Sequence, residues 1–203
     1  IPELLTAKTL GMGFIEGTPI RVFLTEAPSA AKAVLKTLAS SFMHQIFLCG
    51  LFHSDPHPGN FFVTPQGLIA LLDLGSVGEL SPEETGAYRE VLLALLICQA
   101  EGMVEKLEEA GFRVEHPEFL MKTLFPESKC DDKEAAGNSE QKSRFRGLSG
   151  LENQLHVMRE AGVELPDSFV LMARVLISLG GLMNQHRVKF TPAEWGEMLM
   201  QQT

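Results

Sequence analysis

Cysteine is scarce in this sequence, and its spacing excludes two classes of protein. The 203 residues contain three cysteines, Cys49, Cys98 and Cys130, which lie far apart. An odd number of widely spaced cysteines excludes a disulfide framework and a zinc ribbon, and a reducing compartment is the simplest setting. Cys49 and Cys98 fall in apolar segments with helical spacing, so we expect them to be small core residues.

Basic residues and long apolar runs are also in short supply. Lysine and arginine number 17 against 26 acidic residues, for a formal charge of −9. Nucleic-acid binding needs a basic surface, so we expect no nucleic-acid partner. A membrane-spanning helix needs roughly 20 apolar residues, whereas Val91–Cys98 is eight residues long and Phe169–Met183 is interrupted by Arg174. The sequence therefore predicts no transmembrane segment in this chain, and it leaves peripheral membrane contact possible.

The sequence shows no recognisable targeting segment. No secretory signal and no basic, serine-rich transit segment is present. The first residue is isoleucine and not methionine, so we expect the natural N-terminus to lie upstream. The localisation is therefore left unknown by the residues themselves.

Apolar residues make up 45% of the chain, which is enough for the core of one domain. Residues 6–24 hold β-prone pieces broken by glycine and proline, which predicts a short strand or two with a turn at Glu16–Pro19. Residues 29–49 have helical spacing, with Ser29 as the expected N-cap. The apolar stripe of this helix is formed by Val34, Leu38, Phe42 and Ile46.

A loop and a hairpin are predicted after that first helix. Residues 53–60 contain two prolines and a glycine, which exclude regular structure. Phe61–Val63 and Leu68–Leu72 are typical of strands, and the segment Thr64–Gly67 between them has the composition of a turn. We therefore predict a short β-hairpin directly after the loop.

Helices are predicted over the remainder of the chain. Ser81, Pro82 and Glu84 mark the start of a helix that runs to about Gln99, because serine caps it and Glu84 completes a capping box. The charged stretch 127–146 is poor in apolar residues and predicts a mobile insertion. Further helices are predicted over 103–110, 151–161, 166–183 and 192–201. The expected fold class is α+β and predominantly helical.

Three polar residues in an apolar setting have a spacing that indicates a catalytic site. Asn60 lies five residues after Asp55, and Asp73 follows thirteen residues later, after the predicted hairpin. This is the D-x-x-x-x-N pattern of a kinase catalytic loop followed by an Asp-x-Gly metal motif. Phosphoryl transfer needs a carboxylate that orients the acceptor hydroxyl, together with oxygen ligands for Mg²⁺. We expect Gly75 to let the chain turn sharply after Asp73.

A rival interpretation treats His53, Asp55 and His57 as a metal triad, since imidazole and carboxylate hold Zn²⁺ or Fe²⁺. The prolines Pro56 and Pro58 stiffen that loop, and no further histidine or cysteine cluster accompanies it. We favour a different role for His53, which is to brace the loop through a backbone hydrogen bond. His57 is expected near the phosphates or packed locally.

The same residues resemble a known family. Residues 52–60, FHSDPHPGN, followed by LLDLG at 71–75, are similar to the UbiB/ADCK family of atypical protein-kinase-like proteins. That family carries an H-A-D-P-H-P-G-N loop and an L-D-F-G metal motif, and Phe14–Gly17 resembles its hinge. The resemblance implies a kinase-like fold, binding of ATP and Mg²⁺, and a role in coenzyme Q or related prenyl-lipid biosynthesis. It implies that Asp55 is the catalytic-loop aspartate and that Asn60 and Asp73 are metal ligands.

The resemblance also implies a domain organisation. Residues 1–24 would be the hinge strand and linker at the end of an N-terminal lobe missing from this chain, and residues 25–203 would be the C-terminal lobe. Leu74 replaces the phenylalanine of the metal motif, and Ser54 replaces an alanine of the loop. The family's K-x-G-Q motif, β3 lysine and αC glutamate have no counterpart here. An ATP-dependent phosphotransferase or ATPase is therefore expected only if the full-length protein supplies that lobe.

Two alternatives stay open from the sequence. A small-molecule phosphotransferase of the aminoglycoside or choline kinase type shares the H-x-D-x-x-x-x-N loop. A non-catalytic pseudokinase or truncated binding module would keep the fold without turnover. The family's own partners would be a nucleotide and a lipid or prenyl-quinone biosynthesis complex, at a mitochondrial, plastid or bacterial membrane.

Overall fold

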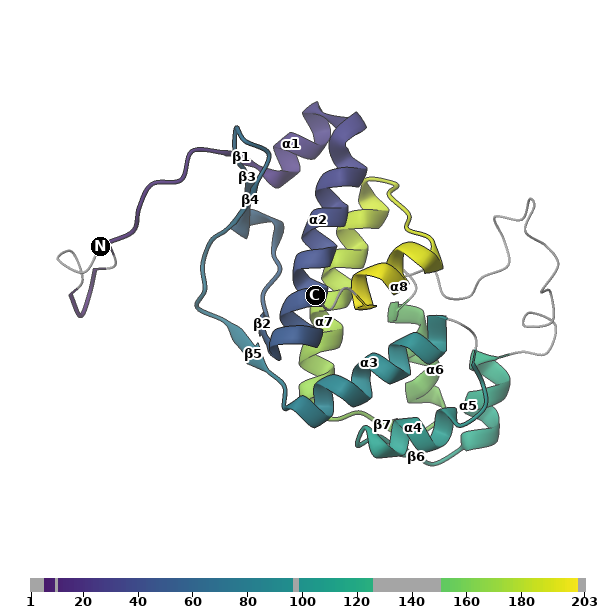
Figure 1. Ribbon diagram of the computed structural model, residues 1–203. Helices are drawn as coiled ribbons and strands as arrows, with labels where there is room; N and C mark the ends of the chain where they lie inside the picture. The colour runs from purple at the N-terminus through teal and green to yellow at the C-terminus, as the bar shows by residue number, and fades with distance from the viewer. Residues whose placement is uncertain (1–5, 10, 97–98, 126–150, 201–203) are drawn as a thin grey trace.

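The computed structural model describes residues 6–9, 11–96, 99–125 and 151–200 (Figure 1). Helices dominate these residues, and the strands form three small sheets. The helix-rich α+β class predicted from the sequence is confirmed. In Figure 1 the sheets formed by β1, β3 and β4 and by β2 and β5 lie along one side of the molecule, and the β6–β7 pair lies among the helices at its lower end. The predicted insertion at 127–146 lies outside the described residues.

The first structured segment differs from its prediction. Strand β1 is confined to Thr18–Pro19, and helix α1 occupies Ile20–Glu26 directly after it. The prediction of strand up to residue 24 is therefore wrong. Ile20 and Leu24 are four residues apart and both are buried, so burial at helical spacing overrides the β preference of the isoleucine and valine in this segment.

The helix predicted over 29–49 is present in three parts. A short 3-10 turn at Pro28–Ala30 leads into α2, Ala31–His44, which continues as a π-helical turn, η3, at Gln45–Cys49. Ser29 is not the cap, because Ala30 takes the N-cap position and no side chain caps the helix. Gly50 ends the run with a left-handed φ of 64°, a conformation that glycine adopts without strain.

Cys49 is exposed, which corrects its predicted place in the core. The wide π-helical turn changes which residues face inward: Ile46 and Phe47 are buried, whereas Leu48 is 43% exposed. A periodicity of 3.6 residues cannot anticipate this change of phase. Cys98 and Cys130 lie outside the described residues.

Two of the sheets frame the predicted loop. Strands β3, Phe61–Val63, and β4, Ile69–Leu71, pair antiparallel with Phe61 opposite Leu71, and β1 joins the outer side of β3. Strand β2, Leu51–His53, pairs with β5, Val77–Glu79, which the sequence did not predict. Gly78 in β5 lies against the ring of Phe52, and a Cβ atom there would collide with that ring.

The helices of the second half follow the sequence closely. The predicted capping box is confirmed: Ser81 N donates to Glu84 Oε2 at 2.8 Å, and Glu84 N donates to Ser81 Oγ at 3.1 Å. In this half, the helix α5 and the two-stranded β6–β7 sheet were not predicted. The helices are α3 Pro82–Leu96, α4 Met103–Glu109, α5 Pro117–Leu124, α6 Leu151–Glu160, α7 Asp167–Gln185 and α8 Pro192–Met200, and the extra strands are β6 Arg113–Val114 and β7 Val163–Glu164.

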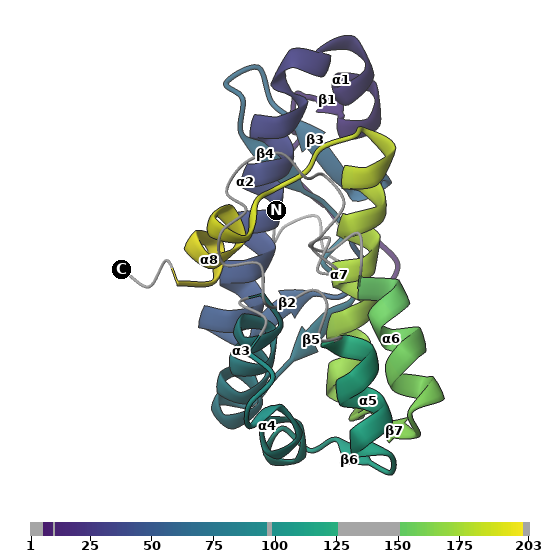
Figure 2. The ribbon, with the colours of Figure 1, turned by 90° about the vertical axis from the view of Figure 1, so that its right-hand side faces the viewer.

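The helices pack around an aromatic centre. Tyr88 of α3, Phe112 and Phe169 of α7 make edge-to-face ring contacts with centroids 4.7 to 6.0 Å apart. Helix α8 lies across α2 and α3, where Glu194 forms an ion pair with Lys32 at 2.9 Å. Figure 2 shows α4, α5, α6 and the β6–β7 pair gathered at the end of the molecule opposite α1.

Helix α7 is long and apolar enough to cross a membrane by length and composition alone. Half of that apolar window is buried inside the protein, and the core helix of a soluble protein meets the same criterion. Nine of its residues are buried, among them Phe169, Leu176 and Met183.

Candidate functional site

The three residues predicted to carry chemistry lie on loops at the ends of β2, β3 and β4. Asp55 follows β2, Asn60 closes a 3-10 turn, η4, at Pro58–Asn60 just before β3, and Asp73 follows β4. The antiparallel pairing of β3 with β4 continues one step further, because Leu72 N donates to Asn60 O at 2.8 Å. This bond holds the chain entering Asp73 against Asn60.

His53 connects the two loops. Its side chain is buried, at 3% exposure. Nε2 lies 2.8 Å from the backbone carbonyl of Asp73, and Nδ1 accepts the backbone N–H of Asp55 at 3.1 Å. A carbonyl oxygen can only accept, so Nε2 is the donor in this bond and Nδ1 is the acceptor in the other. The predicted bracing role of His53 is confirmed.

The turn between Asp55 and Asn60 is closed by further local bonds. Asp55 O accepts the N–H of His57 at 2.7 Å and the side-chain Nδ2 of Asn60 at 3.3 Å. Because Nδ2 faces the loop, the amide oxygen of Asn60 is turned away from that carbonyl. The ring of His57 accepts the N–H of Gly59 at 3.1 Å, so this histidine packs locally. Asp55 itself is an exposed residue.

The sharp turn predicted at Gly75 is made by Asp73. Asp73 has a φ of +55°, and no positive φ is found at Gly75. A left-handed conformation costs a non-glycine residue on the order of 1 kcal/mol, and such positions concentrate at functional sites. Gly75 serves a different purpose: its N–H donates to Asp73 Oδ1 at 3.2 Å, and a Cβ atom would lie 3.0 Å from that oxygen.

These contacts bear on the rival metal triad. Both ring nitrogens of His53 have backbone partners, and Nδ1 of His57 accepts from Gly59. Among the residues that the structure describes, no group of three His, Cys, Asp or Glu side chains could hold a metal ion. An amide oxygen with one or two carboxylates is a donor set suited to Mg²⁺, which keeps several of its waters. The residues therefore fit magnesium better than zinc or iron.

Three residues that hold the loop were missed by sequence reasoning. Ser54 N donates to Ser76 O at 3.0 Å, and the two hydroxyls lie 2.6 Å apart. Arg174 of α7 donates from a terminal guanidinium nitrogen to Ser54 O at 3.1 Å. The signal for Arg174 was present, because a single charge interrupts an otherwise apolar helix. Ser54 stands out in the sequence only as the replacement of an alanine in the loop, and no signal marked Ser76, since the contact between the two serines spans 22 residues.

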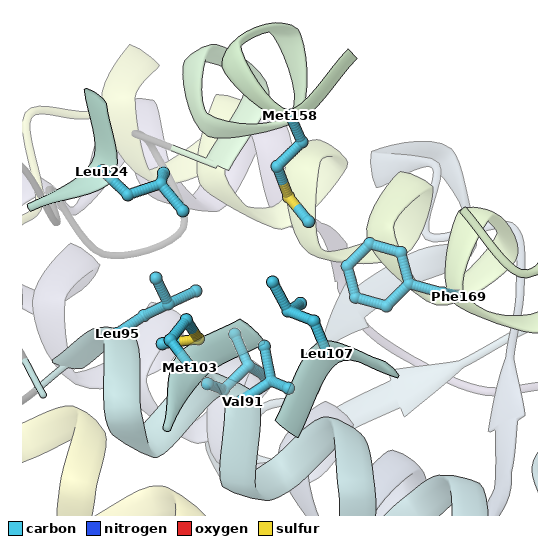
Figure 3. Close-up of a pocket in the computed structure, with 8 residues that line it drawn as sticks. Val91, Leu95, Met103, Leu107, Leu124, Met158 and Phe169 are labelled. Atoms are coloured by element: carbon cyan, nitrogen blue, oxygen red, sulfur yellow. The ribbon is translucent and has the colours of Figure 1, made fainter. Parts of the chain in front are cut away.

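A small apolar cavity lies elsewhere. It holds about 20 Å³ among the helices of the second half, and its lining offers no polar surface (Figure 3). A volume near that of one water with no polar group lining it stays dry and supports no chemistry. The lining residues are Val91, Leu92, Leu95, Met103, Leu107, Leu124, Met158 and Phe169.

Comparison with known proteins supports the resemblance. Residues 1–107 match the model of the ABC1 atypical kinase-like domain. The chloroplastic protein ACTIVITY OF BC1 COMPLEX KINASE 1 of Arabidopsis thaliana is 26% identical over 166 residues, which are 82% of this chain and 22% of that protein. An uncharacterized protein of Synechocystis is 37% identical over 105 residues, which are 48% of this chain and 26% of that protein. The chain thus spans about a quarter of the length of these relatives.

A solved structure shares the fold. It is described as the complex of Rv3197 with erythromycin from Mycobacterium tuberculosis, and it aligns with a TM-score of 0.56 over 92% of this chain and 48% of that one. The two sequences are 19% identical, so the likeness concerns the fold alone. The alignment reaches well beyond residue 107, into the helices of the second half.

Proposed function

This chain belongs to the ABC1 atypical kinase-like family, the group that the UbiB/ADCK resemblance predicted, and we propose that it forms the Mg²⁺- and ATP-binding C-terminal lobe of an atypical kinase or ATPase. The observation that carries the proposal is the position of His53. One buried imidazole bonds the backbone of both Asp55 and Asp73, so the two loops that bear the carboxylates are held as one unit. A solvated turn with unrelated polar residues would not need that connection.

Each residue of the site has a proposed role. Asn60, through its amide oxygen, and Asp73, through its carboxylate, would hold Mg²⁺, which neutralises phosphate charge when bound. Asp55 would orient the acceptor hydroxyl or take its proton, because its carboxylate is exposed while its backbone is fixed on both sides. His53 and Gly75 shape the loops and contact no phosphate in this proposal.

The wider role is proposed from the relatives. The family's association with prenyl lipids supports a function in ubiquinone or related prenyl-lipid biosynthesis. Relatives in a chloroplast and in Synechocystis support a plastid or bacterial setting. Peripheral membrane contact is part of this proposal and rests on the family's association with prenyl lipids. The net charge of −9 repels anionic lipid. Contact with such a membrane would therefore need a part of the surface that lacks acidic residues.

The decisive experiment is calorimetric titration of Mg²⁺-ATP into the complete polypeptide that carries these residues. We expect Asp73→Asn to weaken binding by more than about tenfold, because a charged oxygen ligand is lost. Glu79→Gln is the matched control, since Glu79 is an exposed carboxylate on β5 that makes no bond to the loops in the described residues. Equal affinities for the wild type and Asp73→Asn would reject the metal-ligand role of Asp73.

Asp55→Asn separates binding from turnover. We expect this variant to bind Mg²⁺-ATP within about twofold of the wild type and to lose ATP turnover by about 100-fold or more. Binding without turnover in the wild type itself would favour the non-catalytic alternative. No binding by the wild type would reject the proposed function.

A further inference from the structure

Helix α7 reaches the candidate site through one side chain. Arg174 donates to the backbone carbonyl of Ser54 at 3.1 Å, across 120 positions of sequence. Ser54 directly precedes Asp55 and is 2% exposed. The ABC1 family match ends at residue 107, so this contact joins the matched region to a helix that lies outside it.

The bond completes the polar contacts of a buried residue. The N–H and hydroxyl of Ser54 are already paired with Ser76. Its carbonyl is the remaining polar group, and Arg174 is the partner that the described residues provide. A buried carbonyl without a partner is costly, so loss of the arginine would let the chain at Asp55 relax toward solvent.

The helix that carries Arg174 is firmly anchored. The neighbouring residues Ala173 and Val175 are buried, as are Met172 and Leu176, while Arg174 itself is an exposed residue. Its position along the helix is therefore determined by core packing on either side. A guanidinium on such a support is held close to the loop, because α7 also packs against β5.

We propose that Arg174 is a positioning residue for Asp55, which makes α7 a working part of the site. This inference rests on the proposed function for its catalytic consequence, although its structural consequence can be measured alone. Asp55 is held by His53 at its N–H and by Arg174 through the carbonyl of the preceding residue. A shift of about 1 Å in a reacting group can cost on the order of 100-fold in rate.

The first test is hydrogen exchange of the backbone amides, followed by mass spectrometry of the complete polypeptide. In Arg174→Met, which keeps an unbranched apolar stem, we expect amides within 54–60 to exchange about tenfold or more faster. Amides of α3 and of the β6–β7 pair should be unchanged. Arg113→Met is the matched control, because Arg113 makes an exposed ion pair with Glu164 in β7. If the amides of 54–60 exchanged at the wild-type rate in Arg174→Met, the proposal would be overturned.

The second test is conservative rescue. Arg174→Lys keeps a charged donor on a flexible stem, so we expect exchange and turnover between those of the wild type and Arg174→Met. If Arg174→Met does not fold, Arg174→Gln replaces it in the comparison with Arg174→Lys, because the glutamine side chain is shorter than that of arginine. If the amides of 54–60 exchanged faster in Arg174→Lys than in Arg174→Met, a role of Arg174 based on donation to Ser54 would be contradicted.

Kinetics connect the contact to the chemistry. We expect Arg174→Met to lower the kcat of ATP turnover by about tenfold or more, with KM for ATP within about twofold, because Asp55 moves and the metal ligands do not. A changed KM with unchanged kcat would reject a role through Asp55. If the wild type binds no nucleotide while the exchange result holds, the proposed function fails and the positioning of the loop by Arg174 stands.

Discussion

The protein contains two clusters of polar side chains that serve different purposes, one around His53 in the loops and one around Glu84 in the helices. Around His53, bonds to the backbone hold the loops, and Asp55 and Asp73 are exposed residues. Around Glu84, the carboxylate is used internally: Oε2 accepts from Ser81 N, and Oε1 accepts from Ser168 Oγ at 2.5 Å. Chemistry requires carboxylates that a ligand can reach, whereas stability requires carboxylates that are paired.

The helix cluster extends to a buried phenol. Tyr88 OH lies 2.8 Å from Ser168 Oγ, and since Ser168 donates to Glu84, Tyr88 donates to Ser168. Burial raises the pKa of Tyr88; the hydrogen bond with Ser168 lowers it, and the nearby Glu84 carboxylate raises it. The hydroxyl therefore stays protonated and keeps its role as donor, which ties α3 to the start of α7.

The largest expected effect is in the loop cluster. His53→Ala removes the bonds from its ring to the backbone of Asp55 and Asp73, so we expect Mg²⁺-ATP affinity to fall by about tenfold or more. The free energy of unfolding should fall by about 2 kcal/mol, because a buried ring is lost as well. Calorimetry and urea unfolding measure the two quantities. His156→Ala is the control, as His156 is exposed; equal behaviour of both variants would show that the loops do not depend on His53.

The helix cluster should give the reverse result. Ser168→Ala leaves Tyr88 OH and one oxygen of Glu84 without their partner, so we expect a loss of about 1–3 kcal/mol in the free energy of unfolding. Nucleotide affinity should stay within about twofold of the wild type. Ser178→Ala, an exposed serine on the same helix, should cost little. A drop in nucleotide affinity without a drop in stability would contradict the division between the two clusters.

A smaller effect tests the helix start within that cluster. Ser81→Ala removes the capping bond to Glu84 N, and we expect a loss of about 1 kcal/mol in the free energy of unfolding. Ser29→Ala should change stability far less, because Ser29 caps no helix. Urea unfolding of both variants measures the difference. Equal losses would indicate that Ser81 does not act as a cap.

The smallest expected effect concerns Glu194, a carboxylate that is paired like Glu84 but partly exposed like Asp55 and Asp73. The pKa of Glu194 is lowered, chiefly by the backbone N–H of Thr191 and also by Lys32, and its side chain remains 21% exposed. A lowered pKa in the folded state gives stability that is present above the ordinary glutamate value of 4.5 and is lost as the pH falls below it.

Thermal unfolding from pH 6 to pH 3 tests this dependence. We expect the Tm of the wild type to fall toward that of Glu194→Gln over this range, so that the two converge at the acid end. Glu197→Gln is the control, because the ion pair of Glu197 with Lys36 is longer and more exposed. A constant difference in Tm between wild type and Glu194→Gln would contradict the lowered pKa.

Local signals predicted much of the helical framework. The capping box at Ser81 and the turn at Thr64–Gly67 both act within a few residues. The positions of Asp55, Asn60 and Asp73 on neighbouring loops likewise follow from a pattern only 19 residues long. Their proposed roles stay predictions until binding is measured.

The sequence by itself thus determined most of the helices, the cap at Ser81 and the loop motif, because periodicity and capping depend on neighbouring residues. Only the tertiary structure decided that 20–26 is helical, that Cys49 faces solvent and that β5 pairs with β2. It also decided which side chains hold the loop. The bond from Arg174 to Ser54 spans 120 positions, and a contact of that range depends on how the whole core packs.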